Sequence, residues 1–406
     1  MTTASPIRTG PLAGIRVLDL TAVVLGPVAT QILGDCGADV VKVEPLEGDM
    51  MRANGVSRHQ DMSSVFLSIN RNKRSIALDL KSAQGRDALL RLARGADVLV
   101  HNMRVKAVER LGLGYAAVSA VNPGIVYCVA TGFGQDGPDA DKPAFDDVIQ
   151  AACGLASLIG GERGQPTYAP TLLADKIAGL ATANAVMAAL VHKARSGEGQ
   201  YVEVPMLETL AAFTMAEHMG GLTFDPPGGE VGYARLLAGG RRPMPTLDGH
   251  VAVLPYSATH WRALFAAFER EDLAAKYQLD DRNERNDRVR ELYADLAGLT
   301  ATLSTAACLH LFKRLDIPST RLYAIEELPE HPHLKAVGLF QHVDHPTEGR
   351  IVSIRPQARF ERTPAVLSLP APQVGEHGDE VLREAGLSQD EIDGLAAAGV
   401  LRRPRG

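Results

Sequence analysis

Short β-type runs and helical segments alternate through the first 130 residues of the chain. A β-type run at 14–21, a helical stretch at 26–38 and a second β-type run at 39–44 form a compact βαβ unit. The alternation continues with a strand at 75–80, a helix at 83–96 and strands at 97–101 and 124–130. Apolar strands separated by amphipathic helices predict an α/β fold, with a mainly parallel sheet that helices cover on both faces.

The rest of the chain indicates a second unit, because 406 residues exceed one typical core. The stretch from 145 to about 220 is mostly helical, and the Pro/Gly-rich stretch 226–245 is typical of a linker. Expected elements beyond the first sheet are strands at 201–206, 250–255 and 349–354, and helices at 257–270, 283–300 and 305–314. Ser388 and Glu391 predict a capping box at the start of the last helix.

Composition limits the class of protein. The formal net charge of −6 is spread along the chain, which argues against nucleic-acid binding. The four cysteines lie far apart, none in a C-x-x-C pair, so we expect reduced thiols and neither a zinc site nor disulfides. The N-terminus lacks the apolar core of a signal peptide, and no run reaches eighteen uninterrupted apolar residues. We therefore expect a cytoplasmic protein that does not bind membranes.

Two motifs invite a cofactor or metal interpretation that their context does not support. Residues 131–137, TGFGQDG, contain the G-x-G-x-x-G spacing directly after a strand. A dinucleotide fingerprint must run straight into a helix, and the Pro-containing stretch 138–143 cannot do so. The histidines His331, His333, His342 and His345 lack ligand spacing, so no metal is expected.

Basic residues cluster on the early loops, several of them near the ends of predicted strands. They are Asn72-Lys73-Arg74, Lys81, Arg104, Lys106 and Arg110. Arginine and lysine at strand ends are suited to a phosphate-bearing cofactor. A solvated polar rim is the alternative for any one of them.

Asp175 stands at the head of an apolar, alanine-rich stretch that runs to Leu190. On spacing alone it is a helix-capping residue, because aspartate accepts unpaired backbone N–H groups in the first turn. The alternative is a nucleophile held at a helix start beside small residues that admit a ligand. The helix N-terminus is expected to favour the ionised carboxylate that a nucleophile needs.

Eight segments, taken in chain order, form a recognisable set: GIRVLDLTAVVLGPVATQILGDCGADVVKVE, SINRNKRSIALDLK, ADVLVHN, NPGIVYCVATGFGQDGP, AFDDVIQAACGLASLIG, TLLADKIAG, RSGEGQYVEVPMLE and LPAPQVGEHGDEVL. Together they resemble the class III (CaiB/BaiF) CoA-transferases, a family that includes formyl-CoA and carnitine CoA-transferases and α-methylacyl-CoA racemases. The resemblance runs from about Leu12 to Val400. It implies a doubly wound, Rossmann-like large domain (1–225 completed by 331–406) with an inserted smaller α+β domain (226–330). It also implies an interlocked homodimer.

The resemblance implies that Asp175, followed by Gly179, is the nucleophile. Its carboxylate would attack an acyl-CoA donor, plausibly succinyl-CoA, and pass CoA to a small organic carboxylate through aspartyl-acyl and aspartyl-CoA intermediates. Coenzyme A is then a substrate, with no tightly bound cofactor and no metal. The implied CoA contacts are Val24, Leu25, Leu78, Lys81, Asn102, Met103, Arg104, Arg110, Ala144, Phe145 and Asp146.

Three departures from family patterns bear on the substrate. Val24 stands where the formyl-CoA transferases have a glutamine, and the loss of this polar group beside the acyl site disfavours oxalate or formate. Pro45 stands where those enzymes have an arginine next to the nucleotide. Phe145 replaces a histidine that serves as one of the racemases' acid/base pair, which favours a transferase. A racemase or epimerase, and a non-catalytic CoA-binding protein in which Asp175 only caps a helix, remain the alternatives.

Overall fold

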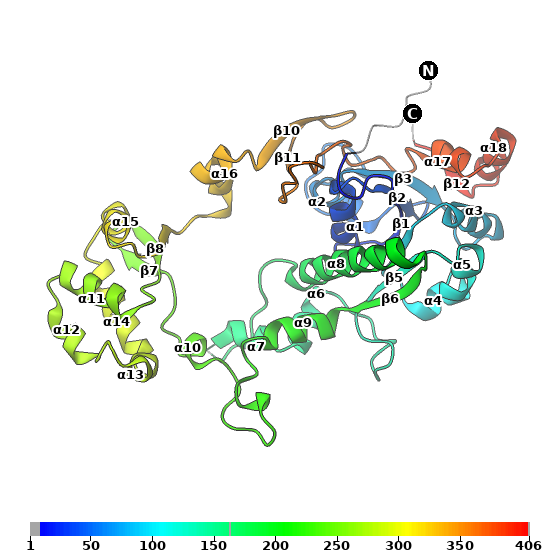
Figure 1. Cartoon of the computed structure of the whole chain (residues 1–406). Coiled ribbons are helices and arrows are strands. Elements are labelled where there is room, and N and C mark those ends of the chain that lie inside the picture. Colours follow the sequence, from blue (N-terminus) through cyan, green and yellow to red (C-terminus); the bar gives the residue numbers. More distant parts are fainter. Residues whose placement is uncertain (1–8, 162–163, 405–406) are drawn as a thin grey trace. The chain divides into compact units, whose positions relative to one another are not determined.

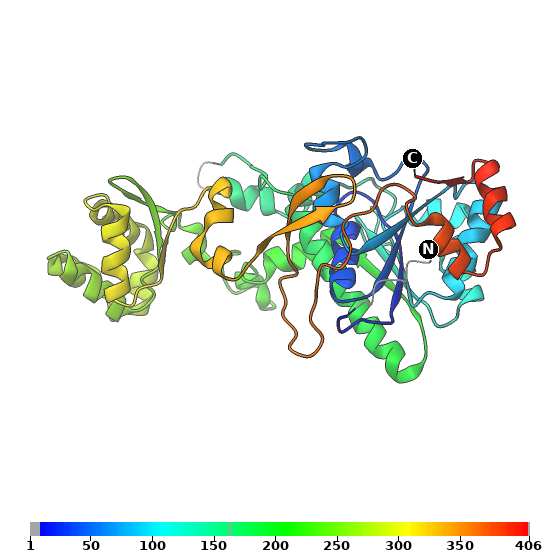
Figure 2. The same cartoon turned by 90° about the horizontal axis from the view of Figure 1, so that it is seen from above.

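The computed structural model describes residues 9–161 and 164–404, and these pack into two units. The larger unit comprises Met1–Ala156, Tyr168–Phe213 and Lys335–Gly406, and the smaller unit comprises Ser157–Thr167 and Thr214–Leu334. Figures 1 and 2 show the elements of each unit from two directions. Apart from the short segment 157–167, the chain thus leaves the larger unit near 213 and returns to it near 335.

A seven-stranded sheet forms the centre of the larger unit, in the order β12-β3-β2-β1-β4-β5-β6. The strands are β1 (Arg16–Leu20), β2 (Asp39–Glu44), β3 (Lys73–Leu78), β4 (Val98–His101), β5 (Val126–Thr131), β6 (Gln200–Pro205) and β12 (Leu401–Arg402). All pairs are parallel except β12 with β3, where the C-terminal tail closes the sheet edge. The order 3-2-1-4-5-6 is that of a doubly wound fold, so the predicted fold class is confirmed.

The two faces of this sheet are covered by different helices (Figure 1). Strand residues such as Leu18 and Leu99 point to a core shared with α3 (Ala83–Arg94), α5 (Tyr115–Val121), α17 (Gly378–Glu384) and α18 (Gln389–Ala397). Their neighbours Val17 and Val98 point to the opposite core, shared with α1 (Leu25–Asp35) and α8 (Leu173–Ser196). Near-continuous apolar strands are therefore buried on both faces, as parallel sheets require.

The remaining helices connect the strands of the larger unit or lead out of it. They are η1 (Met50–Ala53), α2 (Ser64–Ile69), α4 (Val105–Arg110), α6 (Asp146–Ala152), α7 (Leu155–Gly160), α9 (Met206–Met215) and α16 (Pro332–Ala336). A separate hairpin pairs β10 (Phe340–His345) with β11 (Gly349–Ile354). The capping box predicted at Ser388 and Glu391 is present at the start of α18.

The smaller unit combines an antiparallel sheet of β7 (Met244–Thr246), β8 (Gly249–Val253) and β9 (Ser319–Arg321) with a group of helices. The helices are η3 (Gly220–Thr223), α10 (Ala234–Leu237), α11 (Ala258–Ala267), α12 (Glu271–Lys276), α13 (Arg282–Asp287), α14 (Val289–Thr300), α15 (Thr305–Arg314) and η4 (Ile325–Glu330). The predicted linker at 226–245 is therefore wrong in part, because it contains α10 and the start of β7. The helix predicted at 283–300 is two helices, α13 and α14.

Helix α8 carries Asp175 and is the longest helix of the described chain. It begins at Leu173, so Gly179 lies in its second turn and not at its start. A Cβ on Gly179 would lie 2.7 Å from the carbonyl oxygen of Leu25, so glycine here permits close packing of α8 on α1. By length and composition alone α8 would also pass as a membrane span, a test that core helices of globular proteins pass too.

Candidate active site

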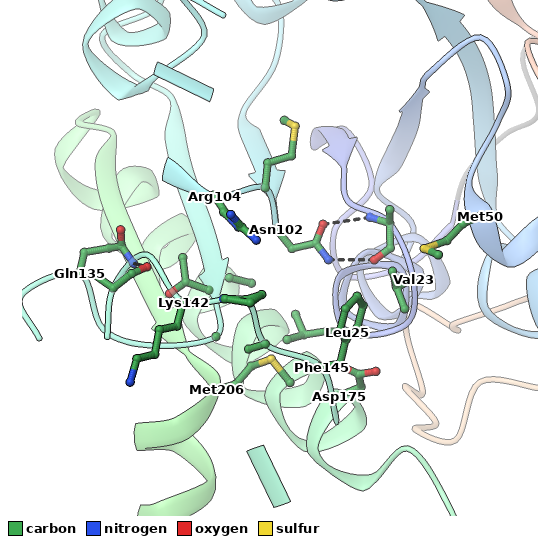
Figure 3. Close-up of a pocket in the computed structure, with 18 residues that line it drawn as sticks. Val23, Leu25, Met50, Asn102, Arg104, Gln135, Lys142, Phe145, Asp175 and Met206 are labelled. Carbon is green, nitrogen blue, oxygen red and sulfur yellow. Dashed lines mark hydrogen bonds between the residues drawn. The ribbon is translucent and has the colours of Figure 1, made fainter. Parts of the chain in front are cut away.

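Two cavities open at the carboxyl ends of the central strands, beside the point between β1 and β4 where the strand order reverses. The Asp175 cavity, of about 320 Å³, is lined by residues at or after the ends of β1, β2, β4, β5 and β6, together with Asp175 (Figure 3). The Lys81 cavity, of about 520 Å³, is lined by residues that follow β1, β2, β3 and β4, including Lys81. Both walls include Ala22, Asn102 and Met103. This is where open α/β sheets place their ligands.

Asp175 lies in the first turn of α8 with its carboxylate in the cavity wall, and the residue is 8% exposed. Its backbone N–H donates to Oδ1 of Asp146 at 2.9 Å. Among the described residues nothing donates a hydrogen bond to the Asp175 carboxylate, and the N-cap Leu172 makes no side-chain cap. The capping function therefore falls to Asp146, and the Asp175 carboxylate faces the cavity unpaired.

Burial and, after it, the negative charge of Asp146 together raise the pKa of Asp175 to about 6. The net shift of the Asp175 pKa is upward, so the expectation that the helix N-terminus would favour the ionised carboxylate is wrong. Apolar neighbours such as Leu25 and Met206 withdraw the carboxylate from water, and the capping group is itself an anion. Such a carboxylate is ionised at neutral pH, and it is more basic and less strongly solvated than an exposed one.

Asp146, expected as a CoA contact, is buried behind the cavity wall. Its Oδ2 accepts from Nε2 of Gln150 at 2.5 Å, and Oε1 of Gln150 accepts from the backbone N–H of Ala169 at 2.9 Å. These bonds tie α6 to the start of α8. Gln150 was missed from the sequence, although Asp146 and Gln150 stand four residues apart on one helix, a spacing at which side chains meet.

The turn after β1 presents Val23 to the Asp175 cavity, whereas Val24, the predicted contact, is buried and absent from the wall. Val23 has φ of 69°, a left-handed conformation rare for a β-branched residue. The side-chain amide of Asn102 holds this turn by donating to Ala22 O at 2.8 Å and accepting from Ala22 N at 3.0 Å (Figure 3). Oδ1 of Asp49 also accepts from Val23 N at 3.3 Å.

Most of the other predicted contacts lie in the two walls. Leu25, Asn102, Met103, Arg104, Ala144 and Phe145 line the Asp175 cavity, and Leu78, Lys81, Asn102 and Met103 line the Lys81 cavity. Arg104 and Lys81 are exposed and form no ion pair within the described chain. Arg110 lines neither cavity; it is exposed on α4, with its Nε donating to Lys106 O at 3.2 Å.

The basic stretch Asn72-Lys73-Arg74 is not part of a phosphate-binding rim. These three residues are buried at the start of β3. Lys73 pairs with Asp19 at 3.0 Å, and Arg74 pairs with Asp39 at 2.6 Å. The charges of Lys73 and Arg74 are therefore neutralised by carboxylates inside the larger unit.

The glycine motif at 131–137 forms part of the Asp175 cavity wall and leads into no helix before α6. The backbone N–H of Gly134 donates to Glu208 Oε1, and that of Gln135 donates to Glu203 Oε1, both at 2.8 Å. A Cβ on Gly134 would lie 2.4 Å from Glu208 Oε1, so glycine is required for this bond. In the sequence, only Glu203, an acidic residue inside an apolar strand, indicated that carboxylates hold this loop by accepting its backbone N–H groups.

The chain is similar to known proteins over most of its length. The model of CoA-transferase family III matches residues 12–378. A succinate–glutarate CoA-transferase of Agrobacterium fabrum is 32% identical over 389 residues, which are 94% of this chain and 97% of the relative. A succinyl-CoA:mesaconate CoA-transferase of Haloarcula hispanica is 31% identical over 398 residues, covering 93% and 97%. The crystal structure of Rv3272 from Mycobacterium tuberculosis superposes with a TM-score of 0.79 at 30% identity, covering 92% of this chain and 99% of that one. The chain belongs to CoA-transferase family III and is an enzyme of that class.

Proposed function

We propose that the enzyme moves CoA from succinyl-CoA to a small dicarboxylate through covalent intermediates on Asp175. The observation that carries the proposal is the unpaired carboxylate of Asp175, held in the wall of a cavity at the reversal point of the sheet. The relatives named for succinate, glutarate and mesaconate support dicarboxylates as the substrate class.

The proposed steps need only this carboxylate and the two substrates. An Asp175 oxygen attacks the thioester carbon, the C–S bond breaks, and CoA leaves as thiolate, giving an aspartyl-acyl anhydride. The thiolate then attacks the aspartyl carbonyl and releases the donor acid, leaving an aspartyl-CoA thioester. The acceptor carboxylate attacks this thioester to form a second anhydride, which the thiolate opens at the acceptor's carbonyl. Asp175 is regenerated, and one thioester has replaced another.

We assign the thioester end of CoA to the Asp175 cavity and its nucleotide end to the Lys81 cavity. The free charges of Arg104 and Lys81 support this assignment, since each stands in a wall with no carboxylate paired to it among the described residues. Arg110 stays a predicted phosphate contact.

Purified enzyme should form a new acyl-CoA from succinyl-CoA and glutarate or mesaconate, measured by liquid chromatography of the CoA esters. Acetate and benzoate serve as comparison acids. Exchange of deuterium at the α-carbon of a chiral 2-methylacyl-CoA, without an acceptor acid, would instead show a racemase. We expect no such exchange, because the described wall of the Asp175 cavity contains no histidine to act as the second acid/base group.

The rate of CoA-thiol release in a single turnover should fall as pH drops through about 6. The pKa of Asp175 is raised to about 6, so its nucleophilic, ionised form is lost below that pH and complete above it. Asp146→Asn removes the neighbouring negative charge and should move this acid limb to lower pH. Asp147→Asn, an exposed change of equal charge on the same helix, is the control. If Asp146→Asn left the acid limb at the same pH, the charge of Asp146 would not contribute to the raised pKa of Asp175.

We also propose that the enzyme is a homodimer in which a second copy covers the outer face of α8. Leu180 and Val191 on that face are 54% and 52% exposed, an apolar surface unusual for a helix facing water. Light scattering of the detergent-free protein should give twice the chain mass of 43.3 kDa. Leu180→Glu should shift the protein toward monomer, whereas Leu247→Glu, at another exposed leucine, should not. A monomeric wild type would contradict this assembly.

A further inference from the structure

The smaller unit contains a buried tyrosine hydroxyl with no partner. Tyr293 on α14 is 3% exposed, and its hydroxyl forms no hydrogen bond within the described chain. Buried polar groups are nearly always paired, and leaving one unpaired costs about 1–3 kcal/mol. Tyr293 lies in the walls of two cavities, of about 170 Å³ and about 470 Å³. Tyr293 therefore stands in two cavity walls with a hydroxyl that has no partner among the described residues, and burial raises its pKa, so the hydroxyl stays protonated.

Arginines gather around this hydroxyl without carboxylates to neutralise them. Arg235 lines the smaller cavity, and Arg241 and Arg242 line the larger one. None of the three forms an ion pair among the described residues, and neither wall contains an aspartate or glutamate. Unpaired arginines around an acid-free hollow are unexpected in a chain with a net charge of −6. Such a hollow suits an anion.

The Gly239-Gly240 turn brings Arg241 to this position. A Cβ on Gly240 would lie 3.2 Å from both Cβ of Tyr293 and Cα of Arg290, so a side chain here would push on α14 and glycine lets the chain run close to it. Gly239 has φ of +69°, which also favours glycine. The two arginines that follow directly are thereby held beside Tyr293, in the same cavity wall.

We propose that the smaller unit binds a small organic carboxylate in the smaller cavity beside Tyr293, with the tyrosine hydroxyl and the guanidinium group of Arg235 as its donors. The charge of Arg241, across Tyr293 in the larger cavity, adds to the attraction. Guanidinium matches the planar carboxylate in charge and geometry. The smaller cavity is well below the roughly 300–1,000 Å³ of pockets for larger ligands. Its aromatic walls, Tyr256 and Trp261 with Tyr293, suit the carbon chain of an acid better than a phosphate. Only the choice of dicarboxylates as probes rests on the proposed function.

Trp261 provides a direct readout of binding. It is the only tryptophan of the chain, and its ring meets that of Tyr293 edge-on at 5.5 Å. Full-length Asp175→Asn protein, free of CoA, is titrated with glutarate and with succinate at constant ionic strength, and tryptophan fluorescence is recorded. We expect a saturable change. Tyr293→Phe and Arg235→Gln should each raise Kd about tenfold or more, because each removes a hydrogen bond to a charged group. Arg314→Gln, at an exposed arginine in neither wall, should leave Kd unchanged.

The absence of a saturable change would overturn the site, as would an unchanged Kd in both Tyr293→Phe and Arg235→Gln. Inorganic phosphate that binds as tightly as glutarate would overturn the carboxylate assignment. The outcome is separate from that of the proposed function, because no transfer occurs in this assay. If the acid binds but the wild type transfers no CoA, only the proposed function is contradicted. If CoA is transferred but no acid binds at Tyr293, only this site is contradicted.

Discussion

Replacing Asp175 with asparagine should lower the rate of CoA transfer by at least about 10³-fold, as expected when a covalent nucleophile is removed. Asparagine keeps the shape of the side chain but supplies no anionic oxygen. The backbone N–H of residue 175, which donates to Asp146, is untouched by the change, so the start of α8 should stay folded. The measurement is the steady-state rate with succinyl-CoA and a dicarboxylate, together with a far-UV circular dichroism spectrum to verify folding.

The covalent intermediate gives this prediction a second, independent readout. Wild-type enzyme is incubated with acyl-CoA and then with hydroxylamine, which converts an activated aspartate into a hydroxamate. Mass spectrometry should find the modification on the peptide that contains Asp175. Asp147→Asn, a nearby exposed change of the same kind, should keep both activity and trapping. Full turnover by Asp175→Asn would rule out the covalent mechanism and leave Asp175 a structural residue.

The sheet could be predicted from the sequence because its signals are local. The run at 39–44 matches β2 residue for residue, and the alternation of strands and helices predicted the mainly parallel sheet covered on both faces. The doubly wound class was implied by the family resemblance. The antiparallel pairing of β12 with β3 was not predicted, because two residues near the C-terminus carry no periodic pattern and find their partner only through tertiary packing.

The cavity walls were predicted less completely, for reasons of side-chain direction. The left-handed turn at Val23 rotates the chain so that Val23 faces the cavity and Val24 faces the core, and sequence spacing does not show this. Asp146 was placed in the right loop but on the wrong side of the wall, because its acceptor function depends on where α8 begins. Asn102 was predicted as a ligand contact. Its second function, holding the turn after β1 through two hydrogen bonds from its side-chain amide, was not predicted.

Buried charges beneath the two cavities explain why a basic stretch was mistaken for a ligand rim. Asp19 and Lys42 lie inside apolar strands, and each is fully buried. Lys42 donates to Asp49 Oδ2 at 2.9 Å and to Thr21 O at 2.8 Å, which fixes the loops after β1 and β2. A charge inside an apolar strand needs a buried partner, so Asp19 was the available signal that some basic residue elsewhere in the chain is also buried.

Replacing Lys73 with methionine should lower the free energy of unfolding by about 3–5 kcal/mol, the cost of leaving a buried charge unpaired. Nζ of Lys73 donates to Asp19 Oδ2 and to Pro27 O, both at 3.0 Å, and to Asn70 Oδ1 at 2.8 Å, with no exposed surface.

Urea denaturation followed by circular dichroism measures the effect. Lys106→Met is the matched control, since its pair with Asp141 is exposed and contributes at most about 1 kcal/mol. The double change Lys73→Met with Asp19→Asn should recover part of the loss, because it removes the orphaned carboxylate charge as well. A single Lys73→Met change that costs no more than the Lys106 control would show that water reaches Asp19. The loops after β1 and β2 would then be held by Lys42 and Asp49 alone.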